Sequence, residues 1–99
     1  MATVRTTTRA DDEAERANRW WIRNRPAARD AFVREYQAAL LLLAESPRAG
    51  LPVRNHRTLR RLVLPKTGYL VFYRYFEEAS VVLVKSVWHA RRGKGPFRG

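Results

Sequence analysis

The hydrophobic residues of this 99-residue chain change their spacing near the middle of the sequence. Before Ser46 they recur with the period of an amphipathic α-helix. After Arg57 they form short runs rich in aromatic and β-branched residues, with proline, glycine or acidic turns between them. A block of helices followed by a block of strands favours an α+β domain over an alternating α/β one.

The first half predicts one short strand and two helices. Thr3 to Thr7 is rich in β-branched residues and is expected to form the strand. Thr8 is expected to cap a helix that runs to about Asn24. Pro26 suits the first turn of a second helix that ends at Ser46. The apolar stripes consist of Ala10, Ala14, Ala17 and Trp21 in the first helix, and of Ala28, Phe32, Tyr36, Ala39, Leu40 and Leu43 in the second.

The second half predicts an antiparallel meander of three strands. After a loop from Pro47 to Asn55, the strands cover Arg57–Leu64, Tyr69–Phe76 and Val81–Trp88. The last of them is apolar at nearly every position, so we expect it to be central or covered on both faces. We therefore expect residues 1–99 to form a single α+β domain: a short N-terminal strand, a helical hairpin and a three-stranded antiparallel meander.

The charge is strongly asymmetric, because the chain carries a net charge of +11 and most of it lies in the second half. Residues 1–50 contain nine arginines and seven acids, whereas residues 51–99 contain eleven basic residues and two acids. We expect the second half to attract phosphate backbones or acidic protein segments. Its end, 91–99, is expected to be a mobile basic tail that includes Lys94 and Arg98.

Several classes of site are excluded by composition. The chain has no cysteine and two distant histidines, so we expect neither a disulfide framework nor a metal site. There is no glycine-rich phosphate loop, and no cofactor is expected. The longest apolar run, Ala38 to Ala44, is far shorter than the roughly 20 residues that span a bilayer. The first ten residues lack the apolar segment of a secretory signal, so we expect a soluble protein with no membrane partner.

Three segments of the second half carry a family resemblance: 68–74 (GYLVFYR), 81–87 (VVLVKSV) and 89–92 (HARR). In this order, length and charge they resemble the C-terminal signature of the ParE/RelE toxins of bacterial type II toxin–antitoxin modules. The order of strand, two helices, loop and three strands is similar to that family's fold over almost the whole chain. The resemblance implies a cytoplasmic bacterial toxin that a cognate acidic antitoxin holds in check.

The two branches of this superfamily differ in activity. RelE-like members are ribosome-dependent mRNA endonucleases whose pattern has an arginine directly after the Gly-Tyr pair and a tyrosine near the C-terminus. Here Leu70 holds the first position and no tyrosine follows Tyr75. The ending 88–92 (WHARR) is similar to that of ParE-type members, which act on DNA gyrase. The resemblance favours a non-enzymatic, ParE-like gyrase inhibitor, with an endonuclease that acts on ribosome-bound mRNA as the alternative.

One candidate site lies at the end of the last strand. We assign target binding to Trp88, His89, Arg91 and Arg92. In a nuclease the last three would be catalytic, because phosphodiester cleavage needs a proton acceptor and cations. No second acid or base accompanies the histidine in the sequence, so a structural or partner-binding role is favoured.

A second candidate site is assigned to antitoxin binding. Trp20 lies off the apolar stripe of its helix and is expected to be exposed beside a groove for an antitoxin helix, whereas Trp21 is expected to be in the core. The arginines of the first meander strand could follow a phosphate backbone or protect an edge strand from aggregation. Arg74 shares a sheet face with Phe72 and Phe76, and both a structural and a functional role are open. The antitoxin-binding set is Trp20, Arg57, Arg60, Arg61 and Arg74.

Overall fold

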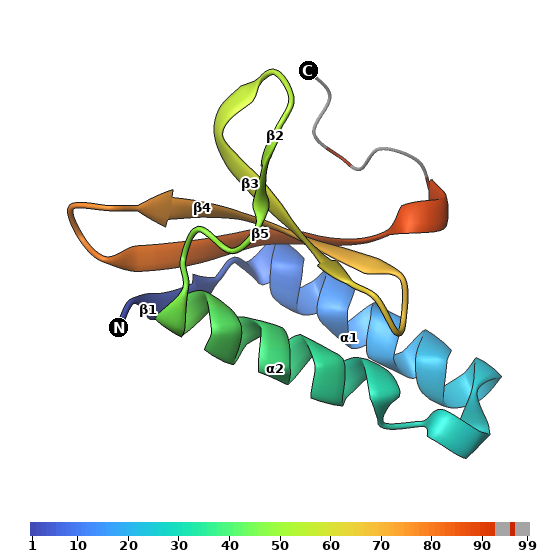
Figure 1. Cartoon of the computed structure of the whole chain (residues 1–99). Coiled ribbons are helices and arrows are strands. Elements are labelled where there is room, and N and C mark those ends of the chain that lie inside the picture. The colour runs from blue at the N-terminus through green and yellow to red at the C-terminus, as the bar shows by residue number, and fades with distance from the viewer. Residues whose placement is uncertain (93–95, 97–99) are drawn as a thin grey trace.

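Residues 1–92 and 96 are described in the computed structural model, so Lys94 and Arg98 of the expected tail lie outside the described residues. Two helices lie side by side on one face of a five-stranded sheet (Figure 1). The expected α+β class is confirmed. The elements are β1 (Thr3–Thr6), α1 (Thr8–Asn24), the 3-10 turn η1 (Pro26–Ala28), α2 (Ala31–Glu45), β2 (Leu51–Val53), β3 (His56–Leu64), β4 (Tyr69–Phe76), β5 (Val81–His89) and the 3-10 turn η2 (Ala90–Arg92).

The strands follow the order β1-β5-β4-β3-β2. β1 pairs in parallel with β5, and the other neighbours are antiparallel. β5 is therefore an interior strand, as its continuous apolar run predicts. Val81 opposes Thr3 of β1 on one side and Phe76 of β4 on the other.

Two sequence-based expectations about β3 and the loop before it are wrong. The expected loop 47–55 contains β2, in which Leu51 pairs with Arg61 and Pro52 pairs with Arg60. An edge strand tolerates a proline, and Asn55 at a φ of 66° supplies the left-handed turn into β3. Because β2 covers it, β3 is not an edge strand, so its arginines do not protect an exposed edge.

The starts of both helices differ from expectation. Thr7, and not Thr8, caps α1: its Oγ1 accepts the backbone N–H of Ala10 at 3.1 Å. Both threonines have the chemistry of a cap, and the end of β1 at Thr6 decides between them. Pro26 begins a 3-10 turn, and α2 starts only at Ala31, after this turn has reversed the chain.

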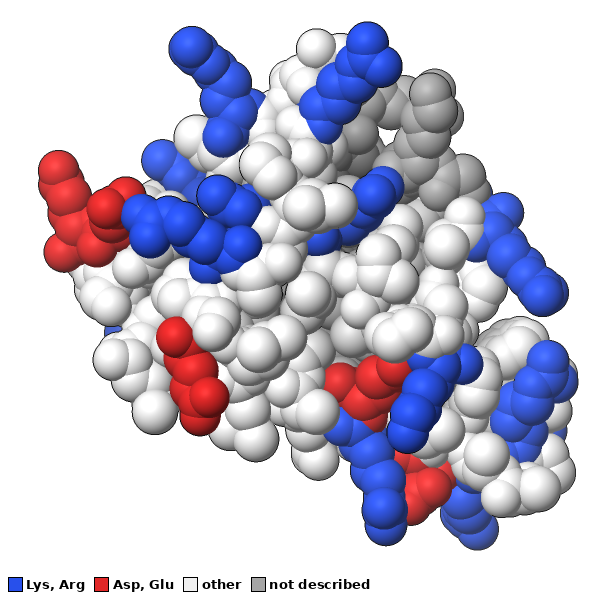
Figure 2. All heavy atoms as spheres, viewed as in Figure 1, with Lys and Arg blue, Asp and Glu red and all other residues white. Residues whose placement is uncertain are grey.

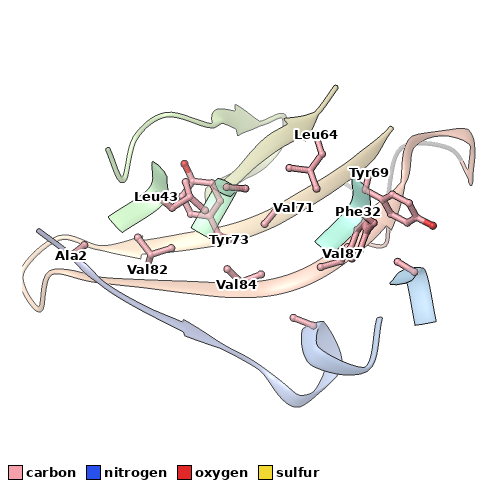
Figure 3. Close-up of a cluster of buried hydrophobic side chains, with 13 residues drawn as sticks. Ala2, Phe32, Leu43, Leu64, Tyr69, Val71, Tyr73, Val82, Val84 and Val87 are labelled. Atoms are coloured by element: carbon pink, nitrogen blue, oxygen red, sulfur yellow. The ribbon is translucent and has the colours of Figure 1, made fainter. Parts of the chain in front are cut away.

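The main core lies between the helical hairpin and the sheet (Figure 3). α1 contributes Ala10 and Ala17, whose small side chains allow a close approach to β5, as the predicted stripe requires. α2 contributes Phe32 and Leu43, both essentially inaccessible to solvent. Full burial of a side chain of that size is worth about 1.5–3 kcal/mol. The sheet contributes Leu64, Tyr69, Val71, Tyr73, Val82, Val84 and Val87.

The opposite face of the sheet has no helix over it among the described residues, and it holds a smaller cluster of Leu59, Leu70 and Phe72. Residues paired across antiparallel strands share a face, so the pairs Leu59–Arg74 and Arg61–Phe72 place both arginines on this open face. Arg60 pairs with Tyr73 and lies on the helix side. The predicted antitoxin-binding arginines therefore divide between the two faces.

At one end of the core, which we call the Tyr73 end (Pro47, Arg48, Gly50, Arg60 and Tyr73), polar groups are closely matched. The Tyr73 hydroxyl accepts the Gly50 N–H and donates to the Pro47 carbonyl, each at 2.8 Å. Arg60 donates to the carbonyls of Gly50 at 2.7 Å and Arg48 at 3.2 Å. Burial raises the pKa of Tyr73, and the bond from Gly50 and the nearby Arg60 oppose that shift. Arg60 therefore stabilises the fold.

The turn between β3 and β4 is tied to α2. The Glu35 carboxylate accepts the backbone N–H groups of Lys66 at 2.7 Å and Thr67 at 3.0 Å, and the Thr67 hydroxyl at 2.7 Å. Charge-assisted bonds of this kind are stronger than neutral ones. The turn is therefore held in a fixed position beside the groove described next.

Candidate functional site

A groove of about 850 Å³ opens at the end of the sheet opposite Tyr73, a size typical of ligand pockets. Its walls are the C-terminal part of α1, the β3–β4 turn, the end of β5 and η2. The predicted target-binding residues Trp88, His89, Arg91 and Arg92 all line it. Trp20, predicted for antitoxin binding, lines the same groove, a juxtaposition that the sequence did not predict.

The groove is electropositive. Arg16, Arg25 and Lys66 line it together with Arg91 and Arg92, and Glu13 is the acid among its lining residues. The ion pairs among the described residues include Arg9–Glu13, Arg19–Glu15, Arg34–Asp30 and Arg48–Glu77, and none of them includes one of these five cations. Lys and Arg likewise predominate over Asp and Glu on the side of the molecule in Figure 2. The five groove cations thus remain without an ion pair in the part of the chain that the structure describes.

Two arginines of the groove lie over indole rings. The Arg92 guanidinium carbon is 4.2 Å from the centre of the Trp88 ring. That of Arg25 is 5.7 Å from Trp20 and 5.9 Å from Trp21. A cation over an exposed indole gains about 0.5–1 kcal/mol, which restricts the guanidinium without neutralising it. The groove therefore presents one oriented, charged guanidinium beside the end of α1 and another in η2.

The two neighbouring tryptophans differ as predicted. Trp20 is 44% exposed. Trp21 packs against the main core, and its indole N–H donates to the Ala28 carbonyl at 2.7 Å. Trp88 adds a further feature, because its indole nitrogen is buried and has no hydrogen-bond partner among the described residues.

His89 is held tightly in the groove wall. Its ring meets Tyr69 edge to face, with the ring centres 4.7 Å apart. Its Nδ1 accepts the Arg91 N–H at 3.1 Å, so the neutral ring carries its proton on Nε2. A Cβ on Gly68, which has a φ of 81°, would stand 3.3 Å from Nε2. Burial raises the pKa of the Tyr69 hydroxyl, with Arg92 opposing the shift.

Glu13 corrects the expectation that no second acid accompanies the histidine, because it lines the same groove. Its Oε1 accepts the Ser86 hydroxyl at 2.7 Å and the Val87 N–H at 3.0 Å, and Oε2 lies 3.5 Å from Nε of Arg9. The carboxylate is therefore engaged in structural bonds. No local pattern predicts this contact, because it joins α1 to a strand more than 70 positions away.

The sheet arginines predicted for antitoxin binding lie away from the groove. Arg61 and Arg74 belong to the open face of the sheet, and neither they nor Arg57 line the groove. The Arg74 guanidinium lies over the Phe76 ring at 4.2 Å. The arginines of the open sheet face are therefore distinct from those of the groove.

The described residues contain no group of three metal-ligating side chains. None of the helices in this part of the chain is long and apolar enough to cross a membrane.

The fold is similar to that of solved bacterial toxins. A chain of the chromosomal ParDE toxin–antitoxin system from P. aeruginosa matches with a TM-score of 0.72 and 12% identity, over 90% of this chain and 96% of that one. A chain of the intact E. coli RelBE toxin–antitoxin complex matches with a TM-score of 0.63 and 24% identity, over 90% of this chain and 96% of that one. The isolated E. coli RelE toxin matches with a TM-score of 0.59 and 25% identity, over 95% of this chain and 89% of that one. A search of the curated proteins gives no match.

The sequence itself identifies the family. Residues 4–93 match the family described as the ParE toxin of the type II toxin–antitoxin system parDE. The match begins in β1 and includes every later helix and strand, with the groove between them. It confirms the resemblance that the ending of the sequence implies. The chain therefore belongs to the ParE toxin family of type II toxin–antitoxin systems.

Proposed function

We propose that this toxin stops growth by binding DNA gyrase through the groove, and that a cognate acidic antitoxin neutralises it. The supporting observation is the set of five cations without ion pairs beside two arginine–indole stacks. Tryptophan and arginine are the residues that most often dominate binding energy at protein interfaces. Gyrase is the target that the resemblance to ParE-type members implies.

The chemistry of the groove favours binding over RNA cleavage. Proton abstraction by His89 needs a free lone pair, but Nδ1 accepts the Arg91 N–H and the neutral ring carries a proton on Nε2. The Glu13 carboxylate is bonded to Ser86 and Val87. Leu70, which holds the position of the RelE arginine, is 5% exposed and apolar, so it cannot stabilise a phosphate. RNA cleavage stays the alternative function.

The antitoxin is expected to cover two surfaces. The exposed apolar side chains Trp20, Ile22, Leu41 and Leu42 of the hairpin suit the apolar side of an amphipathic helix. The arginines of the open sheet face suit an acidic extended segment. Titration with an acidic protein encoded beside this one should show tight binding that weakens as salt is raised. Absence of binding at low salt would refute this part of the proposal.

The groove is tested by the double substitution Arg91→Ala, Arg92→Ala. Both side chains are exposed, so the free energy of unfolding should change by about 1 kcal/mol or less. Growth arrest and inhibition of gyrase supercoiling by the purified protein should both be lost. The matched control is Arg23→Ala, Arg29→Ala, which removes the same charge from exposed positions outside the groove and should keep both activities.

Two results would contradict the proposal. Equal arrest by the wild type and the Arg91→Ala, Arg92→Ala variant, at matched soluble levels, would move the working surface to the open sheet face. Ribosome-dependent cuts in mRNA, found by sequencing RNA ends from a translation reaction with the wild type, would favour the endonuclease. Leu70→Arg alone should not create such cuts, because a free base and the late tyrosine would still be absent.

A further inference from the structure

β5 loses one strand neighbour before it ends. The last register pair between β1 and β5 is Thr6–Val84. The chain then turns into α1, and the Thr7 N–H donates to the Val84 carbonyl at 3.0 Å. From Lys85 onward β5 has β4 on one edge and no described strand on the other. The polar groups along that edge need other partners, since unpaired buried backbone groups are costly.

Side chains of α1 supply these partners. The Thr7 hydroxyl donates to the Lys85 carbonyl at 3.3 Å. Glu13 Oε1 then accepts both the Ser86 hydroxyl and the Val87 N–H. Ser86 is fully buried and the Glu13 side chain is 16% exposed, so these charge-assisted bonds lie largely out of water. Glu13 thus takes the place beside β5 that a longer β1 would occupy.

The two hydrogen bonds to Glu13 lie next to a β-bulge in β5. In the pairing of β4 with β5, Phe72 opposes Ser86, but the next residue, Tyr73, opposes Val84. Lys85 is therefore the extra residue of β5. A bulge interrupts the regular ladder and leaves backbone groups without their usual partners. The acceptor that Glu13 provides lies directly beside this interruption.

The bulge decides on which face of the sheet the side chains at the end of β5 lie. Because side chains alternate along a strand, one extra residue changes the face of every residue that follows. With the bulge, His89 opposes Tyr69 on the helix side, and Trp88 opposes Leu70 on the open side. Without it, a one-residue slip of β5 would exchange the faces of His89 and Trp88. The η2 arginines that follow would be displaced with them.

We propose that Glu13 is a positioning residue of the toxin: by holding the β5 bulge, it fixes the faces on which Trp88 and His89 are presented and so shapes the groove. Glu13 need not touch the target. Its effect on growth arrest rests on the function proposed above. Its effect on the structure does not, and the two can be measured separately.

The experiment compares Glu13→Ala, Glu13→Gln and Asp12→Ala. Asp12 is the adjacent exposed acid and serves as the charge-matched control. In Glu13→Ala, hydrogen exchange at the Val87 amide should speed up about tenfold or more, because its acceptor is gone. The nuclear magnetic resonance signals of the Trp88 indole and the His89 ring should shift, and growth arrest should fall. Glu13→Gln keeps a carbonyl acceptor and should largely restore all three, while Asp12→Ala should match the wild type.

A deletion sharpens the test. Removing Lys85 removes the bulge while keeping Trp88 and His89 on their present faces, so Glu13→Ala in that background should shift neither signal. If Glu13→Ala folds only in the deletion background, the proposal is supported. Unchanged Val87 exchange and unchanged Trp88 and His89 signals in folded Glu13→Ala would overturn it, as would equal shifts with and without Lys85. A toxin that fails to inhibit gyrase would count against the proposed function alone.

Discussion

Tyr73 and Tyr69, which lines the groove, lie towards opposite ends of the core (Figure 3). The Tyr73 end and the groove differ in how their polar groups are satisfied. At the Tyr73 end, the tyrosine hydroxyl has both a donor and an acceptor, and Arg60 bridges two carbonyls. In the groove, five cations have no described ion pair, and two of them, Arg25 and Arg92, lie over indole rings. The first arrangement stabilises the fold, and we propose that the second binds another molecule.

The largest effect on stability is expected from Tyr73→Ala. It removes a side chain with no solvent exposure and leaves the Gly50 N–H and the Pro47 carbonyl unpaired. Loss of a buried aromatic typically lowers the free energy of unfolding by about 3–5 kcal/mol. Tyr73→Phe isolates the hydroxyl and should cost about 1–3 kcal/mol. Denaturant unfolding measures both, and a cost below that of an exposed-site substitution would break the comparison.

The next prediction compares alanine substitutions at two glycines, one at the Tyr73 end and one beside the groove. A Cβ on Gly50 would stand 2.8 Å from the Tyr73 ring and hydroxyl and 2.9 Å from the Arg61 carbonyl, so Gly50→Ala should cost about 1–3 kcal/mol. Gly68→Ala places a side chain at a φ of 81° and close to His89, with a backbone cost of about 1–2 kcal/mol. The two variants should lose similar stability. Growth arrest by Gly68→Ala should fall by more than its loss of stability explains, whereas arrest by Gly50→Ala should not. Equal growth arrest by the two variants at equal stability would show that the groove is not required for arrest.

The smallest effect concerns Tyr36, whose buried hydroxyl has no described partner. Burial raises the pKa of Tyr36 to about 12, and the nearby charge of Asp11 contributes to the rise as the smaller cause. Above pH 10 the unfolded chain releases this proton while the folded protein retains it, so stability falls as the pH rises from 10 towards 12. Tyr36→Phe should weaken this fall and be close to neutral at pH 7. An unchanged slope of unfolding free energy against pH would show that Tyr36 does not contribute.

Local sequence patterns predicted the helices and the three long strands because each is long enough to show its period. They failed at β2, where Gly50 and Pro52 have the composition of a loop while long-range pairing to Arg60 and Arg61 makes a strand. They also failed at the cap, since Thr7 and Thr8 are chemically alike and the end of β1 decides between them.

Sequence reasoning grouped those residues of the candidate site that are neighbours in the sequence. It did not group the residues that come from distant parts of the chain. Trp88, His89, Arg91 and Arg92 follow one another, so their proximity could be predicted. The positions of Trp20 and Glu13 beside them result from α1 packing against β5, which no local spacing encodes. The bulge at Lys85 could not be predicted either. β5 is apolar on both faces, so an extra residue does not disturb its hydrophobic pattern.

The parallel pairing of β1 with β5 also bears on the order in which the fold can form. The meander strands β3, β4 and β5 are joined by short turns and can pair early, whereas the pair Thr3–Val81 closes a loop that spans most of the chain. We expect mutations in β1, such as Val4→Ala, to speed unfolding more than they slow folding. The walls of the groove include α1 and η2, which the ribosome makes nearly first and nearly last. During synthesis the groove is therefore incomplete until translation has passed Arg92.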